Sequence, residues 1–477
     1  MASSASSLHR ASMDRLSVNT TGTARKASSL RSLAVSASDS PSEQPRTSLR
    51  RAASSNLTPS SAPSTPSIHT PRQTSSSSSS RYHHRGDAHI PRMKSTPRLV
   101  YDKDAEQAPS TGMYWSRAPV YGAIPNRSMR AHSITVIDNV VWLFGGCDDR
   151  ESWKDIYCLN VESMQWTHPE CLGDTPPPSR AHSATLVANH KIVFIGGGHG
   201  SVYYDSVYVL DTLTRRWSRP TIAPGPSPPQ RRAHTAVLYE NKIWVFGGGN
   251  GMMALDDVWT LDVAPLTGAI GGGGTGTGGY HGVYHVGGGG FYGPYAPSSS
   301  SSGKTKDGNV TLTWDLVETK GIKKPESRGY HTANLVGNIM VIIGGSDGKD
   351  SFDELWTLNL DTLVWTQIKT NIPYRRLAHS STQVGSYLFI FGGHDSTEYT
   401  SELVLLNLVS LQYETRPVYG KVPSPRGYHA TALADSRVLL IGGFNGHQSF
   451  DDVHILELAA SAYLPQVTSF AIEALIP

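Results

Sequence analysis

The sequence predicts an all-β fold: a six-bladed β-propeller of four-stranded antiparallel blades, preceded by a disordered arm. The first observation is a motif that recurs six times, in which a histidine, an apolar run, a Gly-Gly pair and an aromatic residue follow one another. The second is its period. Successive Gly-Gly pairs lie 51, 51, 97, 48 and 50 residues apart, and repeats near 50 residues are typical of propellers. The third is composition, since Val, Ile, Leu, Tyr and Trp between polar turns favour strands.

The motif gives every blade the same four expected strands. In the second repeat, RAHSATLV at 180–187 forms the first strand and KIVFIGG at 191–197 the second. DSVYVLD at 205–211 forms the third, and the strand around the aromatic residue forms the fourth. One such sheet cannot bury both of its faces, whereas radial packing of six sheets buries them and protects the edges.

The histidines and glycines are expected to be structural, because the same residue types return at one position of every repeat. Each histidine stands 13 or 14 residues before the first glycine of its pair. Where a strand ends near the crowded axis, a residue without a side chain allows close backbone approach. The structural set comprises His132, His182, His234, His331, His379 and His429, with Gly146, Gly197, Gly248, Gly345, Gly393 and Gly443.

Two segments can close the ring, and the sequence leaves the choice between them open. Trp115 lies 17 residues before His132, which is close to the spacing from the other fourth-strand aromatics to the next histidine. Tyr463 lies 20 residues after Gly443, which matches the spacing inside the repeats. The likeness of WSRAP at 115–119 to WSRP at 217–220 favours Trp115 for the last blade.

Composition and repeat register divide the chain into segments. Residues 1–95 form a Ser/Pro/Arg-rich arm, residues 113–463 the propeller and residues 464–477 a short C-terminal tail. The long third period is explained by a Gly-rich insert at 265–310, within blade three between its third and fourth strands. Because glycine-rich chain favours flexible coil, we expect a disordered surface loop there.

The arm is expected to be disordered, since it cannot bury enough apolar surface to offset an ordering entropy of roughly 1–2 kcal/mol per residue. It has 13 Lys/Arg against 4 Asp/Glu, a net charge of +9, whereas the rest of the chain has −6. Its Ser/Thr-Pro pairs and its RKAS and RRAAS motifs are typical of phosphorylation sites, and each phosphate would add about −1.5 to −2 charges. We therefore expect kinases to act on the arm. The acidic body argues against nucleic acid as a partner.

Cysteine usage and hydropathy indicate a reducing compartment. The three cysteines, Cys147, Cys158 and Cys171, include no CxxC pair, so neither a disulfide framework nor a zinc site is expected. No apolar stretch reaches the roughly 18 residues of a membrane span. We expect a cytoplasmic protein, and the cell cortex and the nucleus are compatible locations.

The repeat resembles the kelch family over about residues 113–463, through RAHS, FGG, DVWTLD and a tryptophan in fixed order. Stretches such as VWLFGGCDD and VGSYLFIFGGHD are similar to kelch proteins of the fungal cell-end-marker (tip-elongation) type and to Rab-effector and host-cell-factor kelch domains. The resemblance implies a protein-binding scaffold or adaptor in cell polarity or trafficking, without cofactor or catalytic residue. The alternative is a galactose-oxidase-like metal enzyme on the same propeller, although no motif assigns residues to a copper site.

Binding is expected on the loops that follow the Gly-Gly pairs, because functional residues of such scaffolds lie on loops. Exposed Tyr, Met and Arg are the residue types enriched at interfaces. The mixed charge of these loops suits a polar peptide. The candidate contact residues are Asp148, Asp149, Arg150, His199, Tyr203, Met252, Met253, Lys349, His394 and Tyr399.

Arginines before each first strand form a second candidate feature. In the kelch domains that this chain resembles, arginines near this point hold acidic peptides, and bidentate pairing with carboxylates makes that chemically reasonable. The structural alternative is pairing with Asp or Glu of the adjacent blade. They occupy two registers, two residues before the histidine (Arg130, Arg180 and Arg232) and three residues before it (Arg231, Arg328, Arg376 and Arg426).

Overall fold

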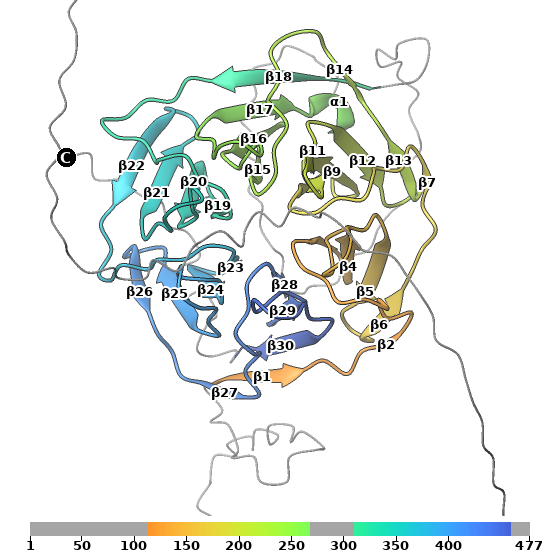
Figure 1. Cartoon of the computed structure of the whole chain (residues 1–477), viewed down its shortest axis with the longest axis vertical. Helices are drawn as coiled ribbons and strands as arrows, with labels where there is room; N and C mark the ends of the chain where they lie inside the picture. Colours follow the sequence, from red (N-terminus) through yellow and green to blue (C-terminus); the bar gives the residue numbers. More distant parts are fainter. Residues whose placement is uncertain (1–111, 268–309, 459–477) are drawn as a thin grey trace, which may run out of the picture. The chain divides into compact units, whose positions relative to one another are not determined.

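The computed structural model describes residues 112–267 and 310–458, which form a ring of six blades (Figure 1). The described part is all-β apart from one short helix, α1 (Ala264–Thr267). The six-bladed propeller that the sequence predicts is therefore confirmed. The arm at 1–95, most of the insert (268–309) and residues 459–477 lie outside the described residues.

Each blade is an antiparallel sheet whose first strand lies near the ring centre and whose fourth lies at the periphery. Blade 1 comprises β3 (Ser133–Ile137), β4 (Val140–Phe144), β5 (Ile156–Asn160) and β6 (Gln165–Thr167). Blade 2 comprises β8 (Ser183–Val187), β9 (Lys191–Ile195), β12 (Val207–Asp211) and β13 (Arg216–Ser218). Blade 3 comprises β15 (Thr235–Tyr239), β16 (Lys242–Phe246), β17 (Val258–Asp262) and β18 (Thr311–Val317).

The second half of the ring repeats this plan. Blade 4 comprises β19 (Thr332–Val336), β20 (Ile339–Ile343), β21 (Leu355–Asn359) and β22 (Val364–Ile368). Blade 5 comprises β23 (Ser380–Val384), β24 (Tyr387–Phe391), β25 (Leu403–Asn407) and β26 (Gln412–Glu414). Blade 6 takes β28 (Ala430–Ala434), β29 (Arg437–Ile441) and β30 (Val453–Glu457) from the end of the described chain and β1 (Met113–Arg117) from its beginning.

The ring closes through β1, which pairs antiparallel with β30 (Figure 1). Trp115 lies opposite Leu456 in this register and is 1% exposed. Its indole packs against Phe391 of blade 5, with the ring centroids 5.3 Å apart. The choice of Trp115, which the likeness of WSRAP to WSRP favours, is therefore confirmed, and Tyr463 lies outside the described residues.

Links between blades add further strands at the periphery. Four links form short strands that pair in parallel with the outermost strand of the next blade, so that they join neighbouring blades edge to edge. These are β2 (Tyr121–Gly122) with β6, β7 (Leu172–Gly173) with β13, β14 (Thr221–Ile222) with β18, and β27 (Val418–Gly420) with β1. A fifth link makes only a single parallel bridge, between Lys320 and Val364 of β22.

The apolar core lies between the blades. At the boundary of blades 1 and 2, Phe144 packs against Phe194 and Trp217, with ring centroids 4.9 and 5.2 Å away. The aromatic residue of every fourth strand is buried in this way. Because each sheet buries its faces only against its neighbours, removal of one blade edge exposes apolar surface on two blades.

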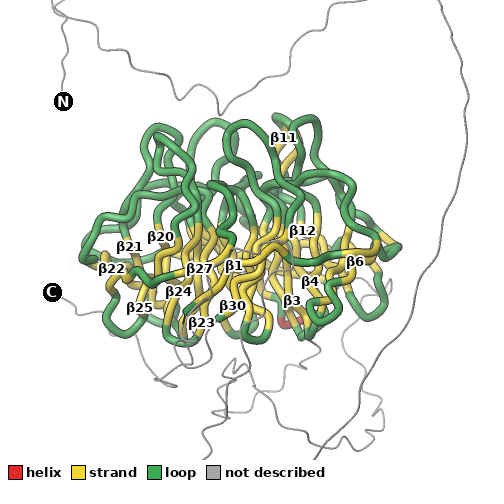
Figure 2. The backbone as a smooth tube through the Cα atoms, turned by 90° about the horizontal axis from the view of Figure 1, so that it is seen from below, coloured by secondary structure: helices red, strands yellow, loops and turns green. Residues whose placement is uncertain are grey.

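The ring has two unlike faces (Figure 2). We call mouth face the side with the tall loops that follow the paired glycines, which include the hairpin β10 (Gly198–His199) and β11 (Val202–Tyr203). The opposite side, the turn face, has the short turns between first and second and between third and fourth strands, and α1 lies there. Helix α1 follows β17 and the described chain resumes before β18, so the insert falls between the third and fourth strands of blade 3. Within the described ranges, no helix is long and apolar enough to cross a membrane.

Candidate functional site

The centre of the mouth face is built on a closed ring of backbone hydrogen bonds. The residue immediately before each repeat histidine donates its N–H to the carbonyl of the same position in the preceding blade, over 2.8–3.0 Å. The last link closes the circle, since the Ala131 N–H bonds to the Tyr428 carbonyl. All six residues have positive φ, between 52° and 58°. The six are Ala131, Ala181, Ala233, Tyr330, Ala378 and Tyr428.

The repeat histidines join neighbouring blades just below this ring. His182 Nε2 lies 2.8 Å from the Ser133 hydroxyl of the preceding blade, and four further histidines make the same bond. The acceptor or donor hydroxyl always belongs to the residue that follows the preceding histidine. His132 is the exception, because Ala430 stands at that position and neither ring nitrogen of His132 has a partner among the described residues.

The paired glycines allow the blades to approach this closely. Gly344 has φ 61°, and a Cβ there would lie 2.2 Å from the Arg376 carbonyl oxygen of the next blade. Gly345 has φ 100°, and its Cβ would lie 2.9 Å from His331 Cβ of its own blade. Both contacts are too short for any side chain, so the first glycine serves the boundary between blades and the second serves the blade itself.

The arginines three residues before the histidine are buried inside the blades. Arg231 donates to both carboxylate oxygens of Asp257 at 2.7 and 2.8 Å and to the Gly247 carbonyl at 3.0 Å. Arg426 repeats this pattern with both oxygens of Asp452, while Arg328 donates to one oxygen of Glu354 and Arg376 to one of Glu402. The acid stands 26 residues later in the same blade, not in the adjacent blade. This corrects the structural alternative that the sequence suggested, and it makes these four arginines part of the framework.

The arginines two residues before the histidine lie on the mouth face instead. Backbone bridges join Arg130, Arg180 and Arg232 to the loops after the glycine pairs, at Cys147, Gly198 and Gly249. In blades 4 to 6 the same position is held by Gly329, Leu377 and Gly427. The mouth therefore has a cationic half, formed by blades 1 to 3, and a half without arginines at this position.

The three mouth arginines differ in their partners. Arg130 lies 3.2 Å from Asp149, and its guanidinium stacks over the Phe444 ring of blade 6 at 3.9 Å. Arg232 donates to the Gly200 carbonyl at 3.1 Å and lies 4.2 Å above the Tyr203 ring. Arg180, between them in the ring, has only the Cys147 thiol as a side-chain partner in the described part of the chain, at 3.6 Å.

Aromatic side chains fill the remainder of the mouth. The Tyr330 and Tyr428 rings, from blades 4 and 6, meet edge to face with centroids 5.4 Å apart. Tyr399 of blade 5 packs edge to face on His394 at 4.6 Å and approaches Gly427 of blade 6, where a Cβ would lie 3.0 Å from its ring. These contacts lie within blade 5 and between blades 4, 5 and 6, so the aromatic half is a packed wall.

The loops themselves are preformed by side-chain oxygens. Asp148 Oδ1 accepts the backbone N–H groups of Arg150 and Glu151 at 2.7 and 2.8 Å. Asn250, Asp347, Asp395 and Asn445 make the same turn in blades 3 to 6. Blade 2 has the β10–β11 hairpin in its place. Five of the six loops are therefore held by one turn chemistry, which fixes the direction of their tips.

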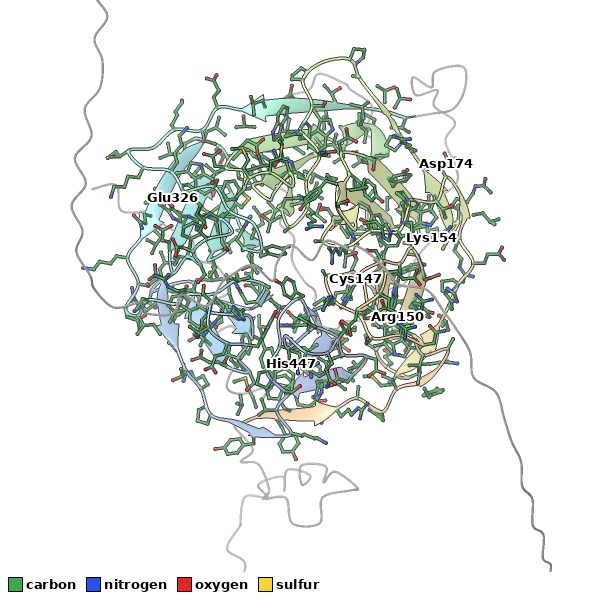
Figure 3. All side chains as sticks on the ribbon, viewed as in Figure 1. Cys147, Arg150, Lys154, Asp174, Glu326 and His447 are labelled. Atoms are coloured by element: carbon green, nitrogen blue, oxygen red, sulfur yellow. The ribbon has the colours of Figure 1, made fainter. Side chains whose placement is uncertain are left out.

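The predicted contact residues separate into two groups. Asp148, Tyr203, His394 and Tyr399 are half-buried and take part in the loop and wall contacts described above. The exposed group comprises Asp149, Arg150, His199, Met252, Met253 and Lys349. On blade 1, Cys147 lies toward the ring centre and Arg150 farther out, while Asp174 and Glu326 lie at the periphery (Figure 3).

Sequence reasoning missed Tyr330, Tyr428, Phe444 and the special position of Arg180. The signal was present, because the residue before each histidine is Ala in four repeats and Tyr in two. What the pattern did not reveal is that this residue has positive φ. The pattern also did not reveal that the arginine three residues before the histidine is buried, whereas the one two residues before it lies on the mouth face.

The charge states of the mouth follow from burial and hydrogen bonds. Burial raises the pKa of Tyr399 to about 12 and that of Tyr428 well above its usual value, so both are neutral phenols. Burial alone would raise the pKa of Asp395, but the Thr397 hydroxyl and backbone N–H groups lower it to about 2. Burial lowers the pKa of His394. At neutral pH the mouth thus presents cationic guanidinium groups, phenol hydroxyls and ionised carboxylates at the rim.

No cluster of three or more His, Cys, Asp or Glu side chains that could hold a metal ion occurs in residues 112–267 and 310–458. The described mouth face gathers hydrogen-bond donors, cations and aromatic faces at one end of the ring axis.

Six four-stranded blades, a buried histidine and a Gly-Gly pair in each, and loops gathered at one face define a kelch-type β-propeller. The chain belongs to the family described as the KLHDC2/KLHL20/DRC7 Kelch-repeats domain, whose model matches residues 108–267 and 283–470.

Individual relatives match parts of this propeller. Acyl-CoA-binding domain-containing protein 4 of Arabidopsis thaliana is 29% identical over 157 residues, which are 33% of this chain and 23% of that protein. Tip elongation aberrant protein 1 of Schizosaccharomyces pombe is 26% identical over 253 residues, 52% and 18% of the two chains. Rab9 effector protein with kelch motifs of Rattus norvegicus is 29% identical over 147 residues, 30% and 39%. The chain thus spans well under half the length of these relatives.

Proposed function

We propose that the protein is a binding scaffold whose mouth face holds a peptide segment of a partner protein through an acidic side chain. The observation that supports this most is Arg180. Its guanidinium is half-buried at the centre of the cationic half, and in the described part of the chain it has a thiol but no carboxylate within ion-pair distance. A partly desolvated cation without a counter-ion favours an anionic ligand.

The groups around Arg180 suit a carboxylate on a peptide. Arg130 and Arg232 flank it on the neighbouring blades, and guanidinium groups pair with carboxylates in a bidentate geometry. The Tyr330 and Tyr428 rings lie within electrostatic reach of Arg180, and their hydroxyls offer further hydrogen bonds to a peptide backbone. Asp149 and Asp148 at the rim of blade 1 would repel a second acidic group there, which favours one orientation of the ligand.

The cellular setting of this scaffold is part of the same proposal. The relatives named for tip elongation and for a Rab9 effector favour a role in cell polarity or membrane trafficking, in the cytoplasm or at the cell cortex. Phosphorylation of the arm at 1–95 by kinases would lower its +9 charge and thereby regulate the scaffold.

Affinity capture with quantitative mass spectrometry tests the proposal. Full-length wild-type chain and Arg180→Ala would be used as baits, with Arg437→Ala as the matched control on the turn face. Arg437 is also partly buried, with 20% of its side chain exposed, and it pairs with Asp435 at 3.5 Å. Removing a hot-spot arginine costs about 2 kcal/mol or more, so Arg180→Ala should lose most of the partner signal and Arg437→Ala should retain it.

Two results would count against the proposal. One is equal capture by wild type and Arg180→Ala when both variants melt at the same temperature. The other is loss of capture with Arg437→Ala alone, which would move the binding surface to the turn face.

A further inference from the structure

Two neighbouring loops on the cationic half of the mouth expose large apolar side chains. Met252 and Met253 of blade 3 are 91% and 65% exposed, and Val202 of blade 2 is 55% exposed. We call these three residues the apolar rim. Exposed apolar side chains are common singly, but two adjacent methionines and a valine on the neighbouring loop, each more than half exposed, favour an interaction site.

The frame of the apolar rim is rigid. Asn250 Oδ1 accepts the N–H groups of Met252 and Met253 at 2.9 and 3.0 Å, and the Asn250 N–H bonds to the Met253 carbonyl at 3.1 Å. Val202 lies opposite His199 in the β10–β11 hairpin. The two methionines and the valine are thus presented by closed turns, so a ligand that binds them does not have to order the loops first.

Tyr203 joins the two loops to each other and to the arginines. Its ring lies against Gly251, where a Cβ would approach it to 3.0 Å, and so it fixes the blade 2 hairpin beside the blade 3 loop. The Arg232 guanidinium lies 4.2 Å from the same ring. The Tyr203 side chain therefore supports both Arg232, which can bind an anion, and the blade 3 loop that has the two methionines.

We propose that the apolar rim binds a large aliphatic or aromatic side chain of the partner peptide, next to the acidic residue that the mouth arginines hold. The inference rests on the proposed function and adds which peptides the mouth face prefers. The arginines bind any accessible carboxylate, whereas the rim selects carboxylates that have a large apolar neighbour. Methionine suits this role, because its flexible, polarisable side chain packs against apolar groups of different shape.

The test is a selection from a random dodecapeptide phage library on the immobilised full-length chain. Wild type would be compared with Met252→Gln/Met253→Gln, with Arg180→Ala and with Leu213→Gln/Val409→Gln. Leu213 and Val409 are the matched control, since they are 77% and 56% exposed in turns of the opposite face. Melting temperatures would verify that all variants fold.

The inference predicts a separation of the two preferences. Wild type and the Leu213/Val409 variant should enrich peptides in which Leu, Ile, Met, Phe or Trp lies within a few residues of Asp or Glu. The Met252/Met253 variant should retain the acidic preference and lose the apolar one. Individual wild-type peptides should bind this variant about tenfold more weakly or worse.

Other outcomes overturn the inference in distinguishable ways. If wild type has no apolar preference, or the Met252/Met253 variant keeps it, the apolar rim does not bind an apolar side chain of the peptide. The acidic preference and the proposed function are unaffected by that result. If the selected peptides lack acidic residues, and Arg180→Ala selects the same peptides as wild type, the proposed function itself is wrong. Concentration-dependent dimers in sedimentation that disappear in the Met252/Met253 variant would assign the rim to a second copy of this chain.

Discussion

A shift of one residue separates the two arginine positions of this propeller. Three residues before the histidine, as at Arg328, the side chain enters the blade and pairs with an acid of that blade. Two residues before it, as at Arg180, the side chain lies on the mouth face. The residue immediately before the histidine has positive φ, a conformation that an L-residue adopts only when the surrounding structure imposes it. Here the closed ring of backbone hydrogen bonds imposes it.

The boundary between blades 6 and 1 lacks one bond that the other five have. We predict that Ala430→Ser supplies the missing hydroxyl to His132 and raises the free energy of unfolding by about 1 kcal/mol. Chemical denaturation of the full chain would measure it. The reciprocal change, Ser183→Ala, removes the bond to His234 Nε2 at 2.9 Å and should cost about 1–2 kcal/mol.

Each of these two substitutions serves as the control for the other, because one adds and the other removes a hydroxyl at the same repeat position. The gain from Ala430→Ser should also vanish when His132 is changed to Ala in a double-mutant cycle. If Ala430→Ser destabilises the chain, or its effect is independent of His132, the histidine–hydroxyl bond is not what joins the blades.

At the scale of single residues, the sequence showed which positions recur in every repeat but not which residues they bond to. The histidines could be identified as structural because they recur at one position, yet the hydroxyl that follows five of them was not recognised as the partner of the histidine in the next blade. The arginines could be counted but not divided between framework and mouth. That division depends on the side to which each successive side chain of the segment points, and the spacing to the histidine does not show it.

Among the elements, β1 determines whether the ring is closed. It is the fourth strand of blade 6, between β30 and β27, and Trp115 is buried against blade 5. We predict that Trp115→Ala lowers the free energy of unfolding by about 3–5 kcal/mol, as for other buried aromatic truncations. Thermal melting followed by tryptophan fluorescence would measure it.

Truncations provide the control for this prediction. A chain that begins at residue 121 lacks β1 and should melt well below the full chain, while one that begins at residue 106 retains β1 and should melt like it. Equal melting of both truncated chains would mean that β1 does not close the ring. The likeness of WSRAP at 115–119 to WSRP at 217–220 favoured this closure, because the sequence of a propeller blade is repeated from blade to blade.

The whole molecule should lose stability in acid through the six buried histidines of the repeats. Burial lowers the pKa of His132 to about 4, that of His182, His234 and His379 to about 3, and that of the other two well below the usual value. In the unfolded chain these rings titrate near pH 6.5, so below that pH the unfolded state binds more protons. Their contribution is fully present above about pH 6.5 and is lost as the pH falls toward 4.

Each histidine contributes at most about 1.4 kcal/mol per pH unit to this slope. Melting temperatures measured between about pH 7.5 and 4.5 should therefore fall steadily on acidification. His182→Gln should have a shallower dependence than wild type because one titrating ring is removed. A melting temperature that stays constant or rises toward low pH would show that the histidines are not held neutral by burial.

The arrangement of the whole ring brings residues far apart in the sequence to one mouth. Arg130, Arg180 and Arg232 come from three blades, and the facing tyrosines from two others. The loops that follow the glycine pairs and the segments that lead into the first strands meet there, as the alternation of strand direction predicts. The repeats therefore indicated the face of the candidate site, whereas the division of that face into a half with arginines and a half with tyrosines became visible only from side-chain contacts.

Hydrogen exchange of the captured complex tests the central claim most directly. The partner would be one that wild type captures and Arg180→Ala does not. On binding, amide exchange should slow in the mouth-face loops of blades 1 to 3, at 147–153, 198–204 and 249–254, and remain unchanged in the turns of the opposite face. Slowed exchange confined to the turn face, or to the arm at 1–95, would contradict a partner site at the mouth of the propeller.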